Sequence, residues 1–485
     1  MLTRLKVDGF KNLVDVDLRF GPYTCIAGAN GSGKSNVFDV IAFLSALADS
    51  SFAEAIRGVR AVADEGSRLA DLLHRSAAGT RDTLRFECEV LIPRTGVDEF
   101  GQSLRASGTS LRYVLELKAR SGEPASGNPL ELVGEELWRL SGCAAGESLS
   151  FASDPDPWLS SVLLPDVSDL PLIDCPKPGV ISVHPDADPS DRGSVADAIA
   201  VGSSSRTVLS TITAKDNATA YLVRHEMRSW RRLALEVNAM RRPDSFDDPV
   251  QLGSDGSHMA STLNALVSST DAGAPGGGDV LGQLSGRIMD VTGELRTVEV
   301  DVDRARESLR IVGKDKHGIA HDARSMSEGT LRFLALALLE FDSSSGLVCL
   351  EEPENGLHPS RIESAAWLLQ GIALDTGFQD GEDNPLRQVI VSTHSPGIVR
   401  FSPADSVLMA DVVDHFDSKL GGRTRTAHFR PLADSWRARA QPETRPVFIT
   451  ELLSYLGYVP VVEPEDVPEN RVDRYADVRT SALTG

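Results

Sequence analysis

The segment at residues 28–35 has the residue types and spacing of a phosphate-binding loop. It reads Gly-Ala-Asn-Gly-Ser-Gly-Lys-Ser and matches the pattern G-x-x-x-x-G-K-[ST]. Glycines leave backbone N–H groups free to point at phosphate oxygens, Lys34 can reach the terminal phosphates, and the Ser35 hydroxyl can bind Mg²⁺. The runs 23–27 and 37–48 predict a strand before the loop and a helix after it, whose positive N-terminus adds attraction. A glycine-rich turn without a ligand is the alternative.

Two adjacent carboxylates follow a second apolar run. The segment 347–350 predicts a buried strand, and Glu351 and Glu352 come directly after it. Ligands lie at the carboxyl ends of parallel strands, so the pair would project beside the phosphate loop. Glu351 suits Mg²⁺, and Glu352 suits a general base that polarises the attacking water. Such a pair can also be a solvated strand end, but the Pro-Glu-Asn-Gly-Leu-His-Pro that follows favours the functional interpretation.

Two further candidates lie on either side of this pair. Ser327, Glu328 and Gly329 precede a helix predicted over 331–341, and a helix N-terminus can bind an anion. An ordinary Ser N-cap is the alternative there. His394 follows the strand predicted over 389–391, which makes it a better catalytic candidate than an isolated histidine.

The composition excludes several classes of protein. The net charge of −21 repels nucleic acid on average, so DNA binding would need a local basic surface. The five cysteines form no C-x-x-C pair, which argues against a zinc site or disulfide framework and suits a reducing cytosol. The start of the chain alternates like a strand rather than a signal peptide, and no run approaches the roughly 18 apolar residues of a membrane span. We therefore expect a cytoplasmic protein without a membrane partner.

The order of these motifs resembles that of the ATP-binding-cassette (ABC) ATPases: phosphate loop, Ser-x-Gly signature, strand with Glu-Glu-Pro, and strand with Ser-Thr-His. More narrowly, the chain is similar to the SMC, RecF and OLD-like branch, often catalogued as prokaryotic AAA-type ATPases. Phe10-Lys11-Asn12 and the Glu-Glu-Pro-Glu-Asn-Gly-Leu-His-Pro segment match that branch. The resemblance covers roughly residues 1–50 and 320–400.

The resemblance implies an α/β fold, a P-loop ABC-type ATPase head assembled from N- and C-terminal segments, with an α-rich or mixed insert. It implies that ATP and Mg²⁺ bind, with Ser35 and Glu351 as the metal ligands. Glu352 would be the hydrolytic base, and His394 would contact the γ-phosphate. Residues 327–329 of one subunit would cap the ATP held by Lys34 of another. The ATP-binding residues that it implies are Gly28, Ala29, Asn30, Gly31, Ser32, Gly33, Lys34, Ser35, Asn36, Lys11 and Asn12.

The chain departs from the wider family in two places. Glu351 stands where many members have Asp, which is a common variant in this branch. The signature reads Ser-Glu-Gly-Thr rather than the transporter form Ser-Gly-Gly-Gln, which speaks against a transporter subunit.

We expect four segments along the chain. The head would contain residues 1–120 and 298–410, separated by an insert at 121–297 that is mixed and then largely helical. A C-terminal extension at 411–485 would be partly disordered. Within the insert, 214–242 is the best helix candidate.

Four arginines on this expected helix raise a DNA-binding hypothesis. Arg224, Arg228, Arg231 and Arg232 lie at i, i+4, i+7 and i+8, so on one helix they would share a face and could contact phosphates. A solvated helix face balanced by acidic neighbours is the alternative, and we favour it.

Three functions are compatible with the sequence. The leading hypothesis is a bacterial anti-phage defence ATPase that senses a trigger and controls a separate effector, such as a nuclease or toxin. It would act as a homodimer or higher homo-oligomer through its heads. Its motivation is a whole ATPase without Toprim-like acidic spacing after His394. The second is a RecF-like DNA-repair ATPase that binds DNA as an ATP-dependent dimer. The third, a transporter ATPase, lacks the transporter-type signature.

Overall fold

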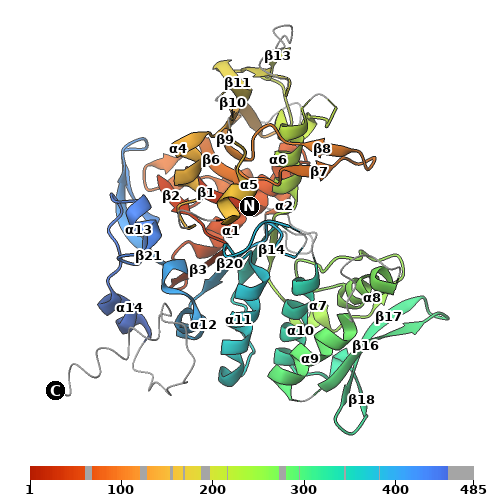
Figure 1. The fold of residues 1–485 in the computed structure, drawn as a ribbon. Helices are drawn as coiled ribbons and strands as arrows, with labels where there is room; N and C mark the ends of the chain where they lie inside the picture. Colours follow the sequence, from red (N-terminus) through yellow and green to blue (C-terminus); the bar gives the residue numbers. More distant parts are fainter. Residues whose placement is uncertain are drawn as a thin grey trace. The chain divides into compact units, whose positions relative to one another are not determined.

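The computed structural model describes residues 1–59, 68–120, 128–152, 157–165, 167, 170–186, 197–215, 217–271, 280–293, 295–342, 346–381 and 383–456. The chain divides into two compact units (Figure 1). Unit 1 consists of Met1–Trp230, Leu374–Gln388 and Leu408–Phe448, and unit 2 of Arg231–Ala373, Val389–Val407 and Ile449–Gly485. The disorder expected at the end of 411–485 concerns residues after 456, which lie outside the described residues.

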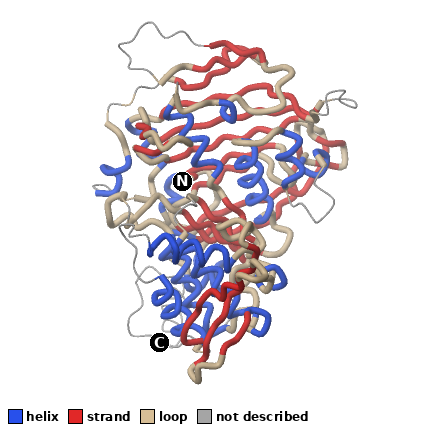
Figure 2. The backbone as a smooth tube through the Cα atoms, turned by 90° about the vertical axis from the view of Figure 1, so that its right-hand side faces the viewer, coloured by secondary structure: helices blue, strands red, loops and turns tan. Residues whose placement is uncertain are grey.

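Unit 1 contains a long antiparallel sheet in the order β13-β12-β11-β10-β9-β6-β1-β2 (Figure 2). In β9, the alternating Leu111, Tyr113, Leu115 and Leu117 are all buried, as a strand with one core-facing side requires. The strands of this sheet are β1 (Leu2–Asp8), β2 (Val16–Arg19), β6 (Thr83–Leu91), β9 (Ser110–Ala119), β10 (Leu130–Arg139), β11 (Pro171–Lys177), β12 (Val180–Val183) and β13 (Asp197–Ala200).

A second group of strands in unit 1 joins the two ends of the chain. β3 (Tyr23–Gly28) lies beside β21 (Val407–Asp417), which pairs antiparallel with β22 (Gly422–Pro431). Figure 1 draws β3 in red and β21 in blue, the colours of opposite ends of the sequence. The Gln388 side chain also donates to the Leu2 carbonyl at 2.7 Å and accepts from the Leu2 N–H at 2.9 Å. The prediction of an α/β fold assembled from N- and C-terminal segments is confirmed.

Helices and two short hairpins complete unit 1. Val37, Val40, Ile41, Leu44 and Leu47 are buried at helical spacing in the helix that follows β3, and Phe38 and Phe43 are buried as well, so the helix is enclosed on more than one face. The helices are α1 (Lys34–Leu47), α2 (Phe52–Gly58), α3 (Leu69–Leu72), α4 (Gly142–Ser148), α5 (Pro157–Val162), α6 (Ala218–Arg228) and α13 (Trp436–Ala440). The hairpins are β4 (Arg75–Ser76) with β5 (Gly79–Thr80), and β7 (Thr95–Val97) with β8 (Ser103–Arg105).

Unit 2 contains two groups of strands and most of the remaining helices. β14 (Arg231–Leu233), β19 (Leu347–Glu351) and β20 (Gln388–Thr393) are neighbours in that order, and β14 is parallel to β19. The other group has the order β15-β17-β16, with β18 on β17, and is made of β15 (Asp244–Ser245), β16 (Leu295–Asp303), β17 (Ser308–Asp315) and β18 (Ala320–Asp322). The helices are α7 (Val237–Met240), α8 (Met259–Asp271), α9 (Val280–Thr292), α10 (Glu328–Phe341), α11 (Ile362–Ile372), α12 (Pro396–Phe401) and α14 (Ile449–Leu456).

The prediction of a single helix over 214–242 is wrong. α6 ends at Arg228, and Arg231 and Arg232 belong to strand β14, where they lie opposite Val348 and Cys349 of β19. Strand pairing with β19 overrides the helical preference of this segment. Arg224, Arg228, Arg231 and Arg232 therefore do not share one helical face.

Among the described residues, no helix combines the length and the apolar character that crossing a membrane requires.

Candidate nucleotide site

The phosphate loop lies between the end of β3 and the start of α1, as the sequence predicted. Gly31 and Gly33 have φ values of +79° and +99°, the left-handed region that favours glycine. A Cβ at Gly33 would lie 2.6 Å from the Ala427 side chain, and one at Gly28 would lie 2.3 Å from the Ala410 carbonyl oxygen. The loop conformation therefore requires glycine at these positions.

The polar groups of the loop fit a bound phosphate chain. Lys34 is 5% exposed, and its Nζ donates to the carbonyls of Gly28 at 2.7 Å and Ala29 at 2.9 Å, so the ammonium is held over the loop. The buried Ser32 hydroxyl has no hydrogen-bond partner among the described residues. A phosphate oxygen would satisfy this hydroxyl and the amides at the start of α1. Ser35, in the first turn of α1, supplies an oxygen of the kind that Mg²⁺ prefers.

Lys11, Asn12 and Asn36 support the loop from one side. Lys11 Nζ donates to Oδ2 of the buried Asp39 in α1 at 2.6 Å, and Asn36 Nδ2 donates to Asn12 Oδ1 at 2.7 Å. The Asn12 carbonyl accepts from the N–H of Ala427 in β22 at 2.9 Å. The structure thus brings these three predicted residues to the loop and its helix.

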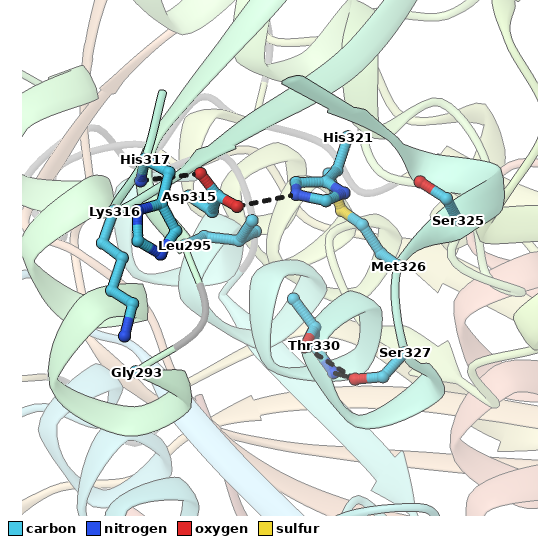
Figure 3. Close-up of a pocket in the computed structure, with 10 residues that line it drawn as sticks. All are labelled: Gly293, Leu295, Asp315, Lys316, His317, His321, Ser325, Met326, Ser327 and Thr330. Atoms are coloured by element: carbon cyan, nitrogen blue, oxygen red, sulfur yellow. Dashed lines mark hydrogen bonds and ion pairs between the residues drawn. The ribbon is translucent and has the colours of Figure 1, made fainter. Parts of the chain in front are cut away.

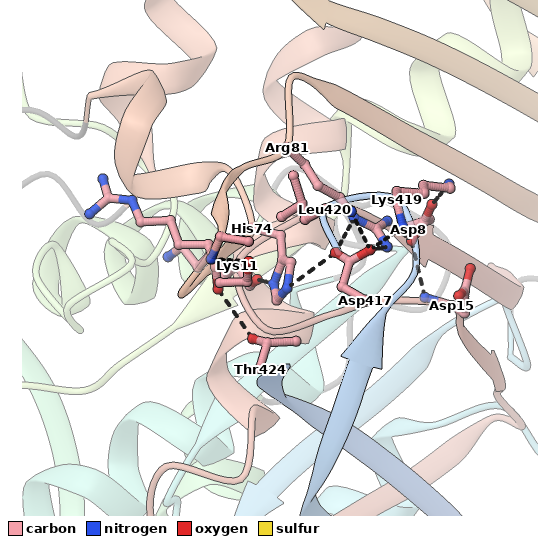
Figure 4. Close-up of polar contacts among 12 residues, drawn as sticks. Asp8, Lys11, Asp15, His74, Arg81, Asp417, Lys419, Leu420 and Thr424 are labelled. Atoms are coloured by element: carbon pink, nitrogen blue, oxygen red, sulfur yellow. Dashed lines mark hydrogen bonds and ion pairs between the residues drawn. The ribbon is translucent and has the colours of Figure 1, made fainter. Parts of the chain in front are cut away.

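A buried polar cluster holds the Lys11 backbone in place (Figure 4). His74 donates through Nδ1 to the Lys11 carbonyl, and its Nε2 lies 3.8 Å from Asp417 Oδ2. Arg81 donates to both oxygens of Asp417, at 2.8 and 3.0 Å, and these bonds hold the pKa of Asp417 at about 2. The sequence analysis missed Arg81 and Asp417, because their long separation along the chain leaves no local signal.

In unit 2, strands β19 and β20 bring the predicted base and histidine together. Glu352 follows β19 and has a φ of +47°, an uncommon backbone conformation for a non-glycine residue. Its N–H donates to the Ser392 carbonyl at 2.9 Å, and its carboxylate forms an ion pair with His394 Nδ1. The end of β20 therefore fixes the direction of Glu352.

Glu351 has an arginine as its neighbour. Arg232 of β14 reaches Glu351 Oε1 at 2.7 Å. The parallel pairing of β14 with β19 accounts for this contact, which the expected helix over 214–242 would not allow. Glu351 offers a carboxylate of the kind that Mg²⁺ prefers, and Arg232 balances its charge when no cation is bound.

A third carboxylate, Glu354, lies behind this pair and was given no role in the sequence analysis. It is 5% exposed, and Thr393 donates its hydroxyl to Oε1. Oε2 is buried without a hydrogen-bond partner among the described residues. Burial raises the pKa of Glu354 to about 6, and the Glu352 carboxylate adds to the rise. Its place in the Glu-Glu-Pro-Glu segment was the available signal.

Glu354→Gln is expected to remove a pH dependence of stability between about pH 4.5 and 6. The folded-state pKa of about 6 exceeds the ordinary 4.5, so Glu354 favours folding below pH 4.5 and loses this contribution as pH rises through 6. At pH 7.5 the buried charge costs roughly 2 kcal/mol. Denaturant unfolding at pH 5 and 7.5 should show the variant gaining stability relative to wild type at the higher pH. A difference that does not change with pH would contradict this role.

The signature lies at the start of α10. Ser327 is the N-cap, since its Oγ accepts from the Thr330 N–H at 3.2 Å, and Glu328 accepts from Arg332 at 3.0 Å. The alternative of an ordinary cap is therefore realised, and Ser327 itself is exposed. Figure 3 shows Ser327 and Thr330 at a pocket of about 360 Å³ that is also lined by residues of the β17–β18 connection.

Gly329 packs against the loop that follows Glu352. A Cβ at Gly329 would lie 2.8 Å from the Gly356 carbonyl oxygen. Gly356 itself has a φ of +74°, and a Cβ there would lie 2.7 Å from the Glu328 carboxyl carbon. The signature and the Asn-Gly-Leu-His segment are thus fitted to each other within one chain.

Gly329→Ala is expected to lower ATP hydrolysis by about 10- to 100-fold, because the added methyl displaces the loop after Glu352. ATP binding should be unchanged, since the phosphate loop belongs to unit 1. Phosphate release and nucleotide titration measure the two effects. The matched control is Gly371→Ala in α11, where an added Cβ meets nothing within 4 Å. Equal rates for the two variants would show that the Gly329 contact is unimportant.

Solved SMC head domains are among the structures that are similar to this chain. A solved SMC head bound to the C-terminal winged-helix domain of ScpA is 13% identical, with 88% of this chain and 98% of that chain covered, at a TM-score of 0.44. The Pyrococcus furiosus Smc head with an extended coiled coil is 13% identical, with 88% and 96% covered and a TM-score of 0.41. The Thermotoga maritima SMC head is 13% identical, with 89% and 98% covered and a TM-score of 0.37. With TM-scores below 0.5, the assignment of the family rests on sequence.

No curated protein matches the chain in sequence. One family model does match, over residues 23–112 and 187–400, which is more than half of the chain. The matched ranges contain the phosphate loop, the signature, the carboxylate pair and His394. This match confirms the resemblance to prokaryotic AAA-type ATPases. The chain belongs to the family described as "AAA domain, putative AbiEii toxin, Type IV TA system".

Proposed function

We propose that this protein is a Mg²⁺-dependent ATPase in which the phosphate loop, the carboxylate pair Glu351–Glu352 and the signature of a second copy act on one ATP. The observation that carries the proposal is that the chain holds two sets of residues arranged for this chemistry. Unit 1 has a glycine-dependent loop with a buried lysine and an unsatisfied hydroxyl. Unit 2 has Glu352 held against His394 at adjacent strand ends.

In this proposal the residues of the chain divide the chemistry among them. Lys34 and the amides at the start of α1 bind the β- and γ-phosphates. Glu352 accepts a proton from the attacking water, and His394, its ion-pair partner, contacts the γ-phosphate. Mg²⁺, when held by Ser35 and Glu351, would neutralise the charge on the phosphate oxygens. The start of α10 in a second copy covers the γ-phosphate from the opposite side.

The direct test is phosphate release from ATP by the full chain. Hydrolysis is expected with Mg²⁺ and is expected to stop when EDTA removes the metal. A protein that binds ATP but never hydrolyses it, with Mg²⁺ or Mn²⁺ and at any protein concentration, would overturn the enzymatic part of the proposal.

We further infer a role in anti-phage defence, in which the ATPase controls a separate effector. The family description refers to the AbiEii toxin and a type IV toxin–antitoxin system, which supports this role. A dimer that closes on ATP and opens after hydrolysis is a two-state switch that a trigger can bias. Affinity purification of Glu352→Gln with ATP, from the native host, should recover a companion nuclease or toxin. Repeated purification without any companion would argue against this role.

The four arginines that suggested DNA binding do not favour the RecF-like alternative, because they do not share one helical face. Arg224 and Arg228 pair with Asp49, at 3.0 and 3.4 Å. Arg231 pairs with Asp342 at 3.1 Å, and Arg232 pairs with Glu351. A phosphate backbone would have to compete with these carboxylates, so the four arginines do not favour DNA binding as the main function.

A further inference from the structure

Three metal-ligating side chains of unit 2 converge away from the phosphate loop and the carboxylate pair. Asp244 belongs to β15, while Asp248 and His258 belong to the connection between β15 and α8. Each offers one ligand atom, and these atoms all lie within 4.8 Å of one another. The group combines one imidazole with two carboxylates, which is a set of ligands that binds divalent metals.

Two buried atoms of this cluster face each other without a hydrogen bond. His258 Nδ1 is buried and has no hydrogen-bond partner among the described residues. It lies 3.6 Å from Asp244 Oδ1 and 3.8 Å from Asp248 Oδ2, which is too far for an N–H···O bond. A ligand between these atoms would satisfy a nitrogen that is otherwise left unpaired.

The Asp244 side chain is the most enclosed member, at 5% exposed. Its Oδ2 accepts from the N–H groups of Ala260 at 2.9 Å and Ser261 at 3.0 Å, at the start of α8. Its Oδ1 is the oxygen that faces His258. Because one oxygen is fixed by two amides, the other is aimed into the cluster rather than toward solvent.

We propose that Asp244, Asp248 and His258 form a binding site for a divalent transition metal ion, Zn²⁺ or Mn²⁺. Bonds of roughly 2.0–2.2 Å to one ion place neighbouring ligand atoms between 3 and 4 Å apart, and the separations of 3.6 and 3.8 Å agree with this. The imidazole favours these ions over Mg²⁺ and Ca²⁺, which prefer oxygen ligands alone.

The ion would fasten the connection that leads into α8 to β15, which supplies Asp244. This helix packs against α10, the helix that begins with the signature. Bound metal would therefore stabilise α8, which packs against the signature helix, without contacting the nucleotide. The competing explanation is a protonated His258 that pairs with the two carboxylates and holds no metal.

Metal binding to the chelator-treated full chain, without nucleotide, distinguishes the two explanations. Equilibrium dialysis against Zn²⁺ or Mn²⁺, followed by elemental analysis, should give one ion per chain. His258→Asn and Asp248→Asn should each weaken this binding at least about tenfold. Asn suits position 258 because it tolerates the left-handed backbone there, with φ +64°. Asp247→Asn, at the exposed neighbouring aspartate, is the matched control and should bind like wild type.

Ser35→Ala separates this site from the phosphate loop and should leave the bound ion in place. The proposal is overturned if wild type binds neither metal, or if His258→Asn binds as well as Asp247→Asn. It is also overturned if Ser35→Ala abolishes binding, because the ion would then belong to the nucleotide site. Crystals of wild type soaked in Mn²⁺ give a second readout that needs no variant. An anomalous peak beside His258 Nδ1 would support the site. The absence of a peak there, in crystals in which another Mn²⁺ site is fully occupied, would refute it.

Discussion

Glu352→Gln is expected to bind ATP as wild type does and to hydrolyse it at least about 100-fold more slowly. Glutamine keeps the shape of the side chain but cannot accept the proton of the attacking water. The backbone should be unaffected, because the 2.9 Å bond from the Glu352 N–H to the Ser392 carbonyl does not involve the side chain. Phosphate release and nucleotide titration on the same protein separate the two quantities.

The same variant is expected to accumulate as an ATP-bound dimer, because in the proposed mechanism hydrolysis opens the dimer. Light scattering with and without ATP measures this. Glu363→Gln, which removes a carboxylate from α11 in the same unit, is the matched control and should neither slow hydrolysis nor trap a dimer. Normal hydrolysis by Glu352→Gln would show that another group is the base.

Lys34→Ala is expected to weaken ATP binding about 100-fold. The ammonium is buried over the loop, bonded at 2.7 and 2.9 Å to the carbonyls of Gly28 and Ala29, where the phosphates would lie. Loss of a charged contact to the triphosphate costs roughly 3 kcal/mol, which is about 100-fold in affinity. Titration with a fluorescent ATP analogue measures the change.

The loss of Lys34 also removes two bonds within the loop, so folding must be checked by circular dichroism and thermal unfolding. Lys118→Ala, at an exposed lysine of β9 in the same unit, controls for the removal of one positive charge. A folded Lys34→Ala protein with wild-type affinity for ATP would mean that residues 28–35 are not the nucleotide site.

Much of the site could be predicted because its signals are local. The phosphate loop, its preceding strand and its following helix are specified by adjacent residues, and the structure has them as β3 and α1. Glu352 and His394 could also be singled out, because each follows a short apolar run that predicts a strand. The ion pair between their side chains was not predicted and is seen only in the structure.

The sequence analysis failed where distant partners decide the conformation. Arg231 and Arg232 fall within the helix predicted over 214–242, but pairing with β19 places both of them in a strand. The Arg232–Glu351 pair and the Arg81–Asp417 pair connect residues far apart in the chain. The raised pKa of Glu354 depends on burial, which spacing alone does not reveal.

The central claim is that one nucleotide is bound by Lys34 of one chain and capped by the signature of another. Mixing two inactive variants, Lys34→Ala and Ser327→Arg, tests this most directly. In a mixed dimer, one site would combine an intact Lys34 from the Ser327→Arg chain with an intact signature from the Lys34→Ala chain. We predict that each variant alone is inactive and that the mixture recovers a measurable fraction of wild-type ATP hydrolysis. A mixture as inactive as its parts, or a Ser327→Arg protein that is fully active alone, would contradict the account.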